Sequence, residues 1–309
     1  MSFQSRIAAV VIGAMLGACA LLDQPDRALA GTIAASGNNV EAGTGELATS
    51  PQGRVYLFRG ALGPIFSRGM DRLAKRLREA GITADVYEFT LCRLIAARAV
   101  HEYQDNPAPI ILIGHSMGGL CTLIFAEVLQ DEHIPVSLVV TIDPAHASPS
   151  VPLNVERYIN IFLSNSILGG GDVLAKQGYQ GHYASFDLSK HGEVTHINID
   201  KMDSVHEQLV TVIRQLATTP AKVEGEALPL RYVVPPDAPV ELWDSGTNVL
   251  AGPNDTLQTI AAVQHVPLWS LTQINPTPVD APLVIGQRII GPRLLMPFVT
   301  MSAKSAPRP

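Results

Sequence analysis

The sequence has few cysteines and no excess of positive charge, and these two shortages each exclude a class of protein. Three cysteines in 309 residues are too few for a disulfide-stabilised scaffold. A formal net charge of -6 argues against nucleic acid as the partner, because binding to a phosphate backbone depends on clustered lysine and arginine. No run of cysteine and histidine has zinc-site spacing, so we expect no metal and no organic cofactor. What is abundant is apolar sequence: 47% of the residues are hydrophobic, enough to bury a large core in more than one unit.

The first 30 residues have the pattern of a secretory signal peptide. A charged start ending at Arg6 precedes an apolar run from Ile7 to Leu22, which is shorter than the roughly 20 residues of a transmembrane helix. Leu16-Gly-Ala-Cys19 resembles a bacterial lipobox, in which Cys19 would carry a lipid and anchor the protein to a membrane. Ala28-Leu-Ala30 instead fits an ordinary cleavage site. Under either alternative we expect export to a bacterial cell envelope, in the periplasm or at the outer membrane.

Composition divides the rest of the chain into two folded units joined by connecting segments. Residues 31–53 are rich in small and polar residues without apolar periodicity, which predicts a flexible spacer. Residues 54–218 alternate apolar strands with helical stretches, which predicts an α/β fold with a small, doubly wound, mostly parallel sheet of about six strands. We expect a proline-rich linker over 219–247, a second small unit over 248–296 and a tail over 297–309.

A nucleophilic serine is predicted where the apolar strand from Ile110 to Ile113 breaks into Gly-His-Ser-Met-Gly and continues as a helix. A serine hydroxyl reacts most readily on a sharp strand-to-helix turn, and flanking glycines remove side chains that would collide there. Ser116 is therefore the candidate nucleophile. His115 is expected to pack or to orient its neighbours, because a residue directly before the serine cannot easily face the hydroxyl across such a turn.

An activated serine also needs a base and a carboxylate that orients the base. Asp143 ends the apolar strand after the elbow, so it shares one edge of a parallel sheet with Ser116. His196 falls in the loop between the last strand and the closing helix, after the nucleophile and the acid in chain order. His191 and His206 also follow the acid, but His196 is the preferred base.

Two backbone amides are expected to stabilise the oxyanion of an acyl-transfer reaction. The first is that of Met117, directly after the nucleophile. The second is expected from the glycine-rich turn after the first strand, where Gly60 and Ala61 are the candidates.

This order of elements, from about Arg54 to Leu216, resembles a small serine hydrolase of the α/β-hydrolase superfamily, with thioesterase-like and lipase-like members the most similar. The resemblance implies an ester or thioester substrate. Thioesterase-like members place the acid soon after the strand that follows the elbow, as Asp143 is placed here. Many other members place it one strand later, which would point to Asp172. Arg59 stands where a histidine often precedes the oxyanion glycine, and the chain has no room for a large lid.

The segment from Asn248 to Ile290 resembles a LysM domain, a βααβ carbohydrate-binding module. The similarity lies in Pro253 to Leu257, Ile260-Ala261, Leu271, Asn275-Pro276 and Leu283 to Gln287. Asn254 replaces a glycine that is usual in such families, and asparagine is the best substitute where φ is positive. The resemblance implies binding to N-acetylglucosamine polymers such as peptidoglycan.

These features predict an exported serine hydrolase that acts on ester or thioester bonds through an acyl-enzyme and is tethered to the cell wall. Two alternatives remain open at this point. One is a non-catalytic, peptidoglycan-binding envelope protein built on a hydrolase scaffold. The other is an acyltransferase, which would use Ser116, Asp143 and His196 and pass the acyl group to an alcohol instead of water.

Overall fold

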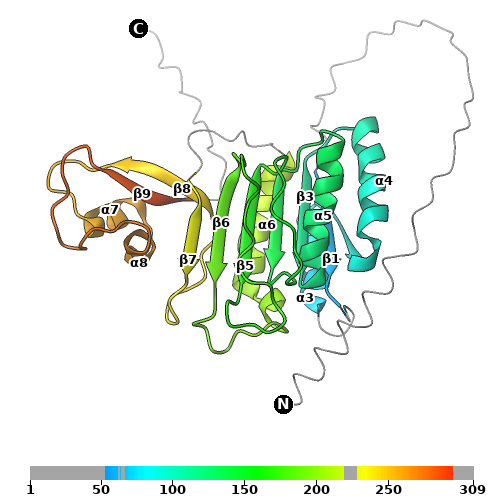
Figure 1. Ribbon diagram of the computed structural model, residues 1–309, viewed down its shortest axis with the longest axis horizontal. Helices are drawn as coiled ribbons and strands as arrows, with labels where there is room; N and C mark the ends of the chain where they lie inside the picture. The colour runs from blue at the N-terminus through cyan, green and yellow to red at the C-terminus, as the bar shows by residue number, and fades with distance from the viewer. Residues whose placement is uncertain (1–52, 62, 64–66, 219–227, 295–309) are drawn as a thin grey trace, which may run out of the picture. The chain divides into compact units, whose positions relative to one another are not determined.

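A computed structural model of the chain describes residues 53–61, 63, 67–218 and 228–294 (Figure 1). The expected signal peptide with Cys19, nearly all of the spacer over 31–53 and the tail over 297–309 lie outside these residues. Contacts within the chain separate residues 1–49 from residues 50–309, and all described elements belong to the second unit. In the part of the chain that is described, no helix combines the length and apolar character needed to cross a bilayer.

The main element is a seven-stranded parallel sheet, so the α/β class and the parallel sheet expected from the sequence are observed, with one strand more. The spatial order of the strands is β2-β1-β3-β4-β5-β6-β7. In chain order they are β1 (Arg54–Arg59), β2 (Thr83–Glu88), β3 (Ile110–His115), β4 (Leu138–Ile142), β5 (Arg157–Phe162), β6 (His182–Asp187) and β7 (Leu230–Val233). The chain moves outward from β1 to β2 and then returns to the other side of β1 at β3. Ligands of open α/β sheets bind beyond the carboxyl ends of strands at such a reversal.

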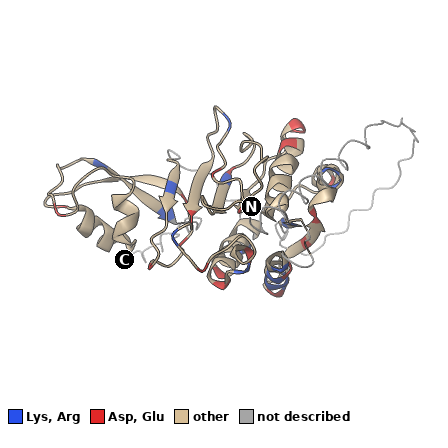
Figure 2. Ribbon diagram, turned by 60° about the horizontal axis from the view of Figure 1, so that its bottom comes forward, with Lys and Arg blue, Asp and Glu red and all other residues tan. Residues whose placement is uncertain are grey.

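Helices cover both faces of the sheet (Figure 1). The helices α3 (Arg68–Glu79) and α6 (Asp203–Thr218) pack on one face, and α4 (Cys92–Asp105) and α5 (Met117–Asp131) pack on the other. Alternate residues of the strands β1, β3, β4, β5 and β6 enter the two cores, as the two-residue period of a strand requires. In Figure 2 the charged residues gather on the helices, while the strands of the sheet are mostly tan.

A smaller βααβ unit follows the sheet. It consists of β8 (Trp243–Leu250), α7 (Leu257–Gln264), α8 (Leu268–Thr272) and β9 (Arg288–Leu294), and β8 pairs with β9 in antiparallel fashion. Its own core includes Leu257, Ile260, Leu271, Leu283 and Ile289. The turn before α7 contains Asn254 at φ 63°, the backbone conformation for which asparagine was expected to stand in for glycine. The element order is the one expected from the sequence.

The segment expected to be a proline-rich linker over 219–247 differs in the structure, because much of it is folded. Its residues 230–233 form β7, which lies parallel to β6 and is an edge strand of the sheet. Trp243 begins β8 and is buried, with its ring 5.3 Å from that of Tyr232 in β7. Prolines that flank a short edge strand do not interrupt its hydrogen bonds. The proline-rich composition of this segment nevertheless predicts a linker, so the strand could not be recognised from composition.

Candidate active site

The predicted nucleophile lies on a strained turn between β3 and α5. Ser116 has φ 57° and ψ -122°, a conformation that costs a non-glycine residue on the order of 1–3 kcal/mol. Its backbone is held on both sides: its N–H donates to the Ile142 carbonyl at 3.0 Å, and its own carbonyl accepts from the amides of Gly119 and Ala145. The surrounding structure therefore maintains the strain and keeps the serine at the carboxyl end of β3.

The glycines of the elbow are required by close backbone contacts. A Cβ added to Gly114 would lie 2.1 Å from the carbonyl oxygen of Gly118, and one added to Gly118 would lie 2.1 Å from the carbonyl oxygen of Phe58. Both distances are far below van der Waals contact. The first turn of α5 thus lies directly against β1 and β3, as a sharp strand-to-helix turn requires.

The candidate acid and base are in direct contact. The Nδ1 of His196 lies 2.6 Å from Oδ2 of Asp143, so Nδ1–H donates to the carboxylate and leaves Nε2 free to accept a proton. The Asp143 carboxylate is fully buried, and its other oxygen accepts from the Leu163 amide at 3.2 Å. The carboxylate is therefore fixed from two sides and cannot turn away from His196.

Ser116 and His196 lie at the same edge of the sheet, yet no hydrogen bond joins their side chains in this structure, which describes both residues. His196 is bonded to His115, the residue before Ser116. Nε2 of His115 lies 2.8 Å from the His196 carbonyl oxygen, and the centroids of the two rings are 4.8 Å apart. Hydrogen bonds between a nucleophile and its base are often long before substrate binds.

The alternative acid is engaged elsewhere. Oδ1 of Asp172 accepts from the hydroxyls of Tyr183, at 2.8 Å, and Ser185, at 2.5 Å. Its Oδ2 pairs with Nε of Arg231 at 2.7 Å. These contacts hold the pKa of the Asp172 carboxyl below its usual range despite partial burial. Among the described residues, the hydrogen bonds of Asp172 are made with Tyr183, Ser185 and Arg231 and not with a histidine.

The other two histidines considered as base also lie apart from Asp143. His191 is buried and faces Glu193 at 3.3 Å. His206 is buried within α6, and its Nε2 lies 2.8 Å from the carbonyl oxygen of Asp200. Burial lowers the pKa of His206 to about 4. His196 is thus the histidine that pairs with the acid.

The turn after β1 lies against the nucleophile. A Cβ on Gly60 would lie 2.7 Å from Cβ of Ser116, so a side chain there would displace the serine. The Gly60 amide, one of the two candidates for the second oxyanion donor, donates to the hydroxyl of Ser67 at 3.0 Å in this structure. Ala61 follows in the same turn, and Met117 is the first residue of α5, where helical amides have no intrahelical acceptor.

Sequence reasoning did not identify Ser67. It lies at the start of α3, a position at which serine usually caps the helix, but its side chain makes no capping hydrogen bond. Its hydroxyl lies 2.8 Å from Nδ1 of His115 instead. A serine before a helical pattern was the available signal, but that signal predicts a cap and not a contact with the elbow.

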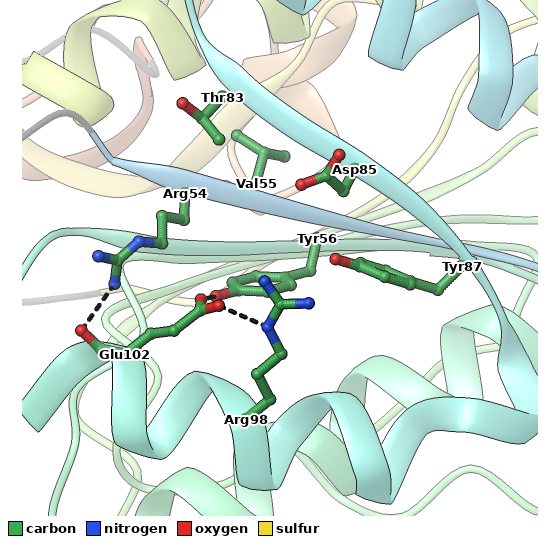
Figure 3. Close-up of a pocket in the computed structure, with 8 residues that line it drawn as sticks. All are labelled: Arg54, Val55, Tyr56, Thr83, Asp85, Tyr87, Arg98 and Glu102. Carbon is green, nitrogen blue, oxygen red and sulfur yellow. Dashed lines mark hydrogen bonds and ion pairs between the residues drawn. The ribbon is translucent and has the colours of Figure 1, made fainter.

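Two of the hollows on the described surface are formed by residues of known position in the fold. One of about 290 Å³ is at the opposite end of the sheet from Ser116, between the first residues of β1 and β2 and the helix α4 (Figure 3). Three of its polar side chains bond to one another, with Glu102 accepting from Tyr56 at 2.9 Å and from Arg98 at 2.6 Å. The other, of about 220 Å³, adjoins the loop after Asp143 and is lined by His146 and Ser148 among others. Within the described ranges no three His, Cys, Asp or Glu side chains are grouped as metal ligands would be.

Comparison with known proteins finds similarity only among solved structures. No protein-family model and no curated protein matches the chain. A structure from Xanthomonas campestris pv. campestris assigned to the α/β superfamily of hydrolases is 13% identical, with a TM-score of 0.32, over 53% of this chain and 97% of its own. The RedJ thioesterase of prodiginine biosynthesis from Streptomyces coelicolor is 18% identical, with a TM-score of 0.24, over 43% and 53%. The NocB thioesterase domain of the nocardicin cluster is 16% identical, with a TM-score of 0.26, over 52% and 86%. Independently of these matches, the strand order and the helices on both faces fit an α/β-hydrolase fold.

Proposed function

We propose that the chain is a serine hydrolase that cleaves an ester or thioester bond through an acyl-enzyme. The observation that carries this proposal is the strained Ser116 beside the hydrogen-bonded pair of Asp143 and His196. Strain of this kind persists where the surrounding structure maintains it, and it is common at active sites. A turn with no chemical role would have no need for a serine at φ 57° next to a buried carboxylate and a histidine.

In the proposed reaction, Oγ of Ser116 attacks the carbonyl carbon while Nε2 of His196 takes its proton. Asp143 holds the imidazole in the tautomer with a proton on Nδ1 and stabilises the imidazolium that forms. The imidazolium then protonates the departing alcohol or thiol, leaving an acyl group on Ser116. Water attacks this ester with His196 again as base, which releases the carboxylic acid and restores the serine. The amides of Met117 and Ala61 are the proposed oxyanion donors.

Exposed apolar side chains support an apolar acyl group. Ile197 directly follows the base and is 46% exposed, and Ile167 and Leu168, in the loop over Asp143, are 71% and 46% exposed. That loop is anchored at the acid, since a Cβ on Gly169 would lie 2.1 Å from Oδ1 of the Asp143 carboxylate. Apolar side chains on one side of an active site favour substrates that cover them. We expect hydrolysis rates to rise with acyl chain length over short esters.

The βααβ unit supports a second part of the proposal, binding to peptidoglycan or another N-acetylglucosamine polymer. Its element order and the positive φ of Asn254 agree with the predicted carbohydrate-binding module. The protein would then act in the cell envelope after export. We expect the full chain to cosediment with insoluble peptidoglycan and chitin, and not with cellulose; equal sedimentation with cellulose would contradict this part.

The hydrolase is tested by labelling the full chain with a fluorophosphonate probe, which reacts with activated serines. We expect the parent to be labelled and the Ser116→Ala and His196→Ala variants, shown to be folded, to remain unlabelled. Ser185→Ala and Asp172→Asn should label like the parent, because these side chains bond to each other and to Tyr183 and Arg231, and neither bonds to His196. No labelling of a folded parent would contradict the mechanism. Product analysis in the presence of competing alcohols separates hydrolysis from acyl transfer.

A further inference from the structure

Three consecutive hydrogen bonds join the turn after β1 to the loop that carries His196. The Gly60 amide donates to Oγ of Ser67 at 3.0 Å, and that oxygen lies 2.8 Å from Nδ1 of His115. Nε2 of His115 lies 2.8 Å from the His196 carbonyl oxygen. Ser67 and His115 are both buried, so the connection runs through the interior, from the oxyanion side of Ser116 to the base.

The groups at each end decide the direction of these hydrogen bonds. A carbonyl oxygen can only accept, so Nε2 of His115 carries a proton and donates to His196. Burial, together with the neighbouring His196, lowers the pKa of His115 to about 3, so the ring is neutral and its Nδ1 is an acceptor. The Ser67 hydroxyl therefore donates to Nδ1, and its oxygen accepts from Gly60. The polar atoms of Ser67 and His115 are therefore all hydrogen-bonded in only one assignment of the protons.

Ser67 does not have the role that its position would suggest. It is the N-cap residue of α3, and an ordinary capping serine accepts from an amide in the first turn of its own helix. Here no side-chain capping bond is formed, and the hydroxyl is used by Gly60 and His115. The first turn of α3 is instead bonded by Asp200, whose Oδ2 accepts from the Gly69 amide at 2.9 Å. The serine is thus free for the connection.

We propose that Ser67 and His115 are positioning residues that hold the two halves of the active site in register. They direct the Gly60 amide away from Ser116, so that the next amide, that of Ala61, is left to meet the oxyanion together with Met117. They also hold the main chain of His196, and this fixes the position of its imidazole relative to Ser116. This inference rests on the proposed hydrolase function and assigns what organises it; neither side chain contacts the reacting atoms.

The kinetic test compares two buried serines. Ser67→Ala should lower the maximal rate of fluorophosphonate labelling at least about tenfold with little change in probe affinity, because a displaced oxyanion donor acts on the transition state. Ser185→Ala, which also removes a buried hydroxyl that donates to a side chain, should leave the rate unchanged. His115→Gln, which can still donate to the His196 carbonyl, should retain more of the rate than His115→Ala. A parental rate in a folded Ser67→Ala protein overturns the proposal.

A second measurement does not depend on activity or on a variant that folds. Nitrogen NMR of the histidine-labelled parent should show His115 with a proton on Nε2 and none on Nδ1, unchanged from pH 5 to pH 9. A protonated Nδ1 would overturn the proposal. The two proposals fail in different ways: a folded parent that is never labelled, but has this tautomer, contradicts the hydrolase function while the hydrogen-bonded connection stands.

Discussion

Replacing Asp200 by asparagine should stabilise the protein at pH 8 and lose that effect in acid. The carboxyl group is fully buried, with Oδ2 bonded to the Gly69 amide at 2.9 Å and Oδ1 without a hydrogen-bond partner. Burial raises its pKa from 3.8 to about 6, although Lys201 and Arg72 act in the opposite direction. The ionised form is therefore the one that the folded protein tolerates poorly.

The magnitude follows from the difference between folded and unfolded pKa values. A difference of about 2 units, at about 1.4 kcal/mol each, amounts to about 3 kcal/mol. Because the folded pKa is raised, this carboxyl favours the fold fully below pH 3.8, and that contribution is lost as the pH rises through about 6. Asparagine keeps an acceptor for Gly69 but buries an unpaired N–H, at a cost of about 1 kcal/mol. The net gain of Asp200→Asn should be about 2 kcal/mol at pH 8, changing to a loss of about 1 kcal/mol near pH 4.

Urea unfolding between pH 4 and pH 8.5 measures this change directly. The control is Asp203→Asn, because Asp203 is exposed and pairs with Arg76 at the surface. Its effect should stay below about 1 kcal/mol at every pH. The quantity compared is the difference in free energy of unfolding between Asp200→Asn and the parent. If this difference is the same at pH 5 and at pH 8, the reasoning is refuted, because the folded Asp200 carboxyl then does not change its charge in this range.

Two further substitutions test the packing around the site and at β8. Gly118→Ala should lower the free energy of unfolding by about 3 kcal/mol and abolish probe labelling, because the new Cβ would lie 2.1 Å from the Phe58 carbonyl oxygen. The control is Gly192→Ala, whose Cβ would meet open space and which should be neutral in denaturation and labelling assays. Trp243→Ala should cost about 3–5 kcal/mol in urea unfolding, because the buried ring contacts those of Tyr232 and Trp269, and a loss below 1 kcal/mol would show that β8 adds little to the sheet's stability.

The parts of the site that sequence could predict are those set by local pattern or by the geometry of parallel strands. The elbow is contiguous in sequence, so its strand, its glycines and its serine appear together. Asp143 ends the strand next to β3, and parallel neighbours end at the same edge, so its proximity to Ser116 follows from topology. His196 was selected by chain order, and the structure has it hydrogen-bonded to Asp143.

The parts that could not be predicted depend on surfaces that exist only after folding. The strand β7 has four residues, with prolines shortly before and after it, and it forms because the edge of β6 offers backbone partners and because Tyr232 packs against Trp243. Neither influence is visible in a window of sequence. Composition therefore predicted a linker where the sheet continues.

The choice between the amides of Gly60 and Ala61 shows the same limit at the level of one hydrogen bond. From sequence the two amides were equivalent, because both lie in one glycine-rich turn after β1. Ser67 separates them by accepting from Gly60, and its orientation depends in turn on His115, 48 residues further along the chain. The Gly60 N–H can turn to an oxyanion only if it gives up its bond to the Ser67 oxygen, at a cost of about 1 kcal/mol. The proposal that Ala61 is the second donor thus rests on a hydrogen bond between elements that are far apart in sequence, and it could be made only from the folded chain.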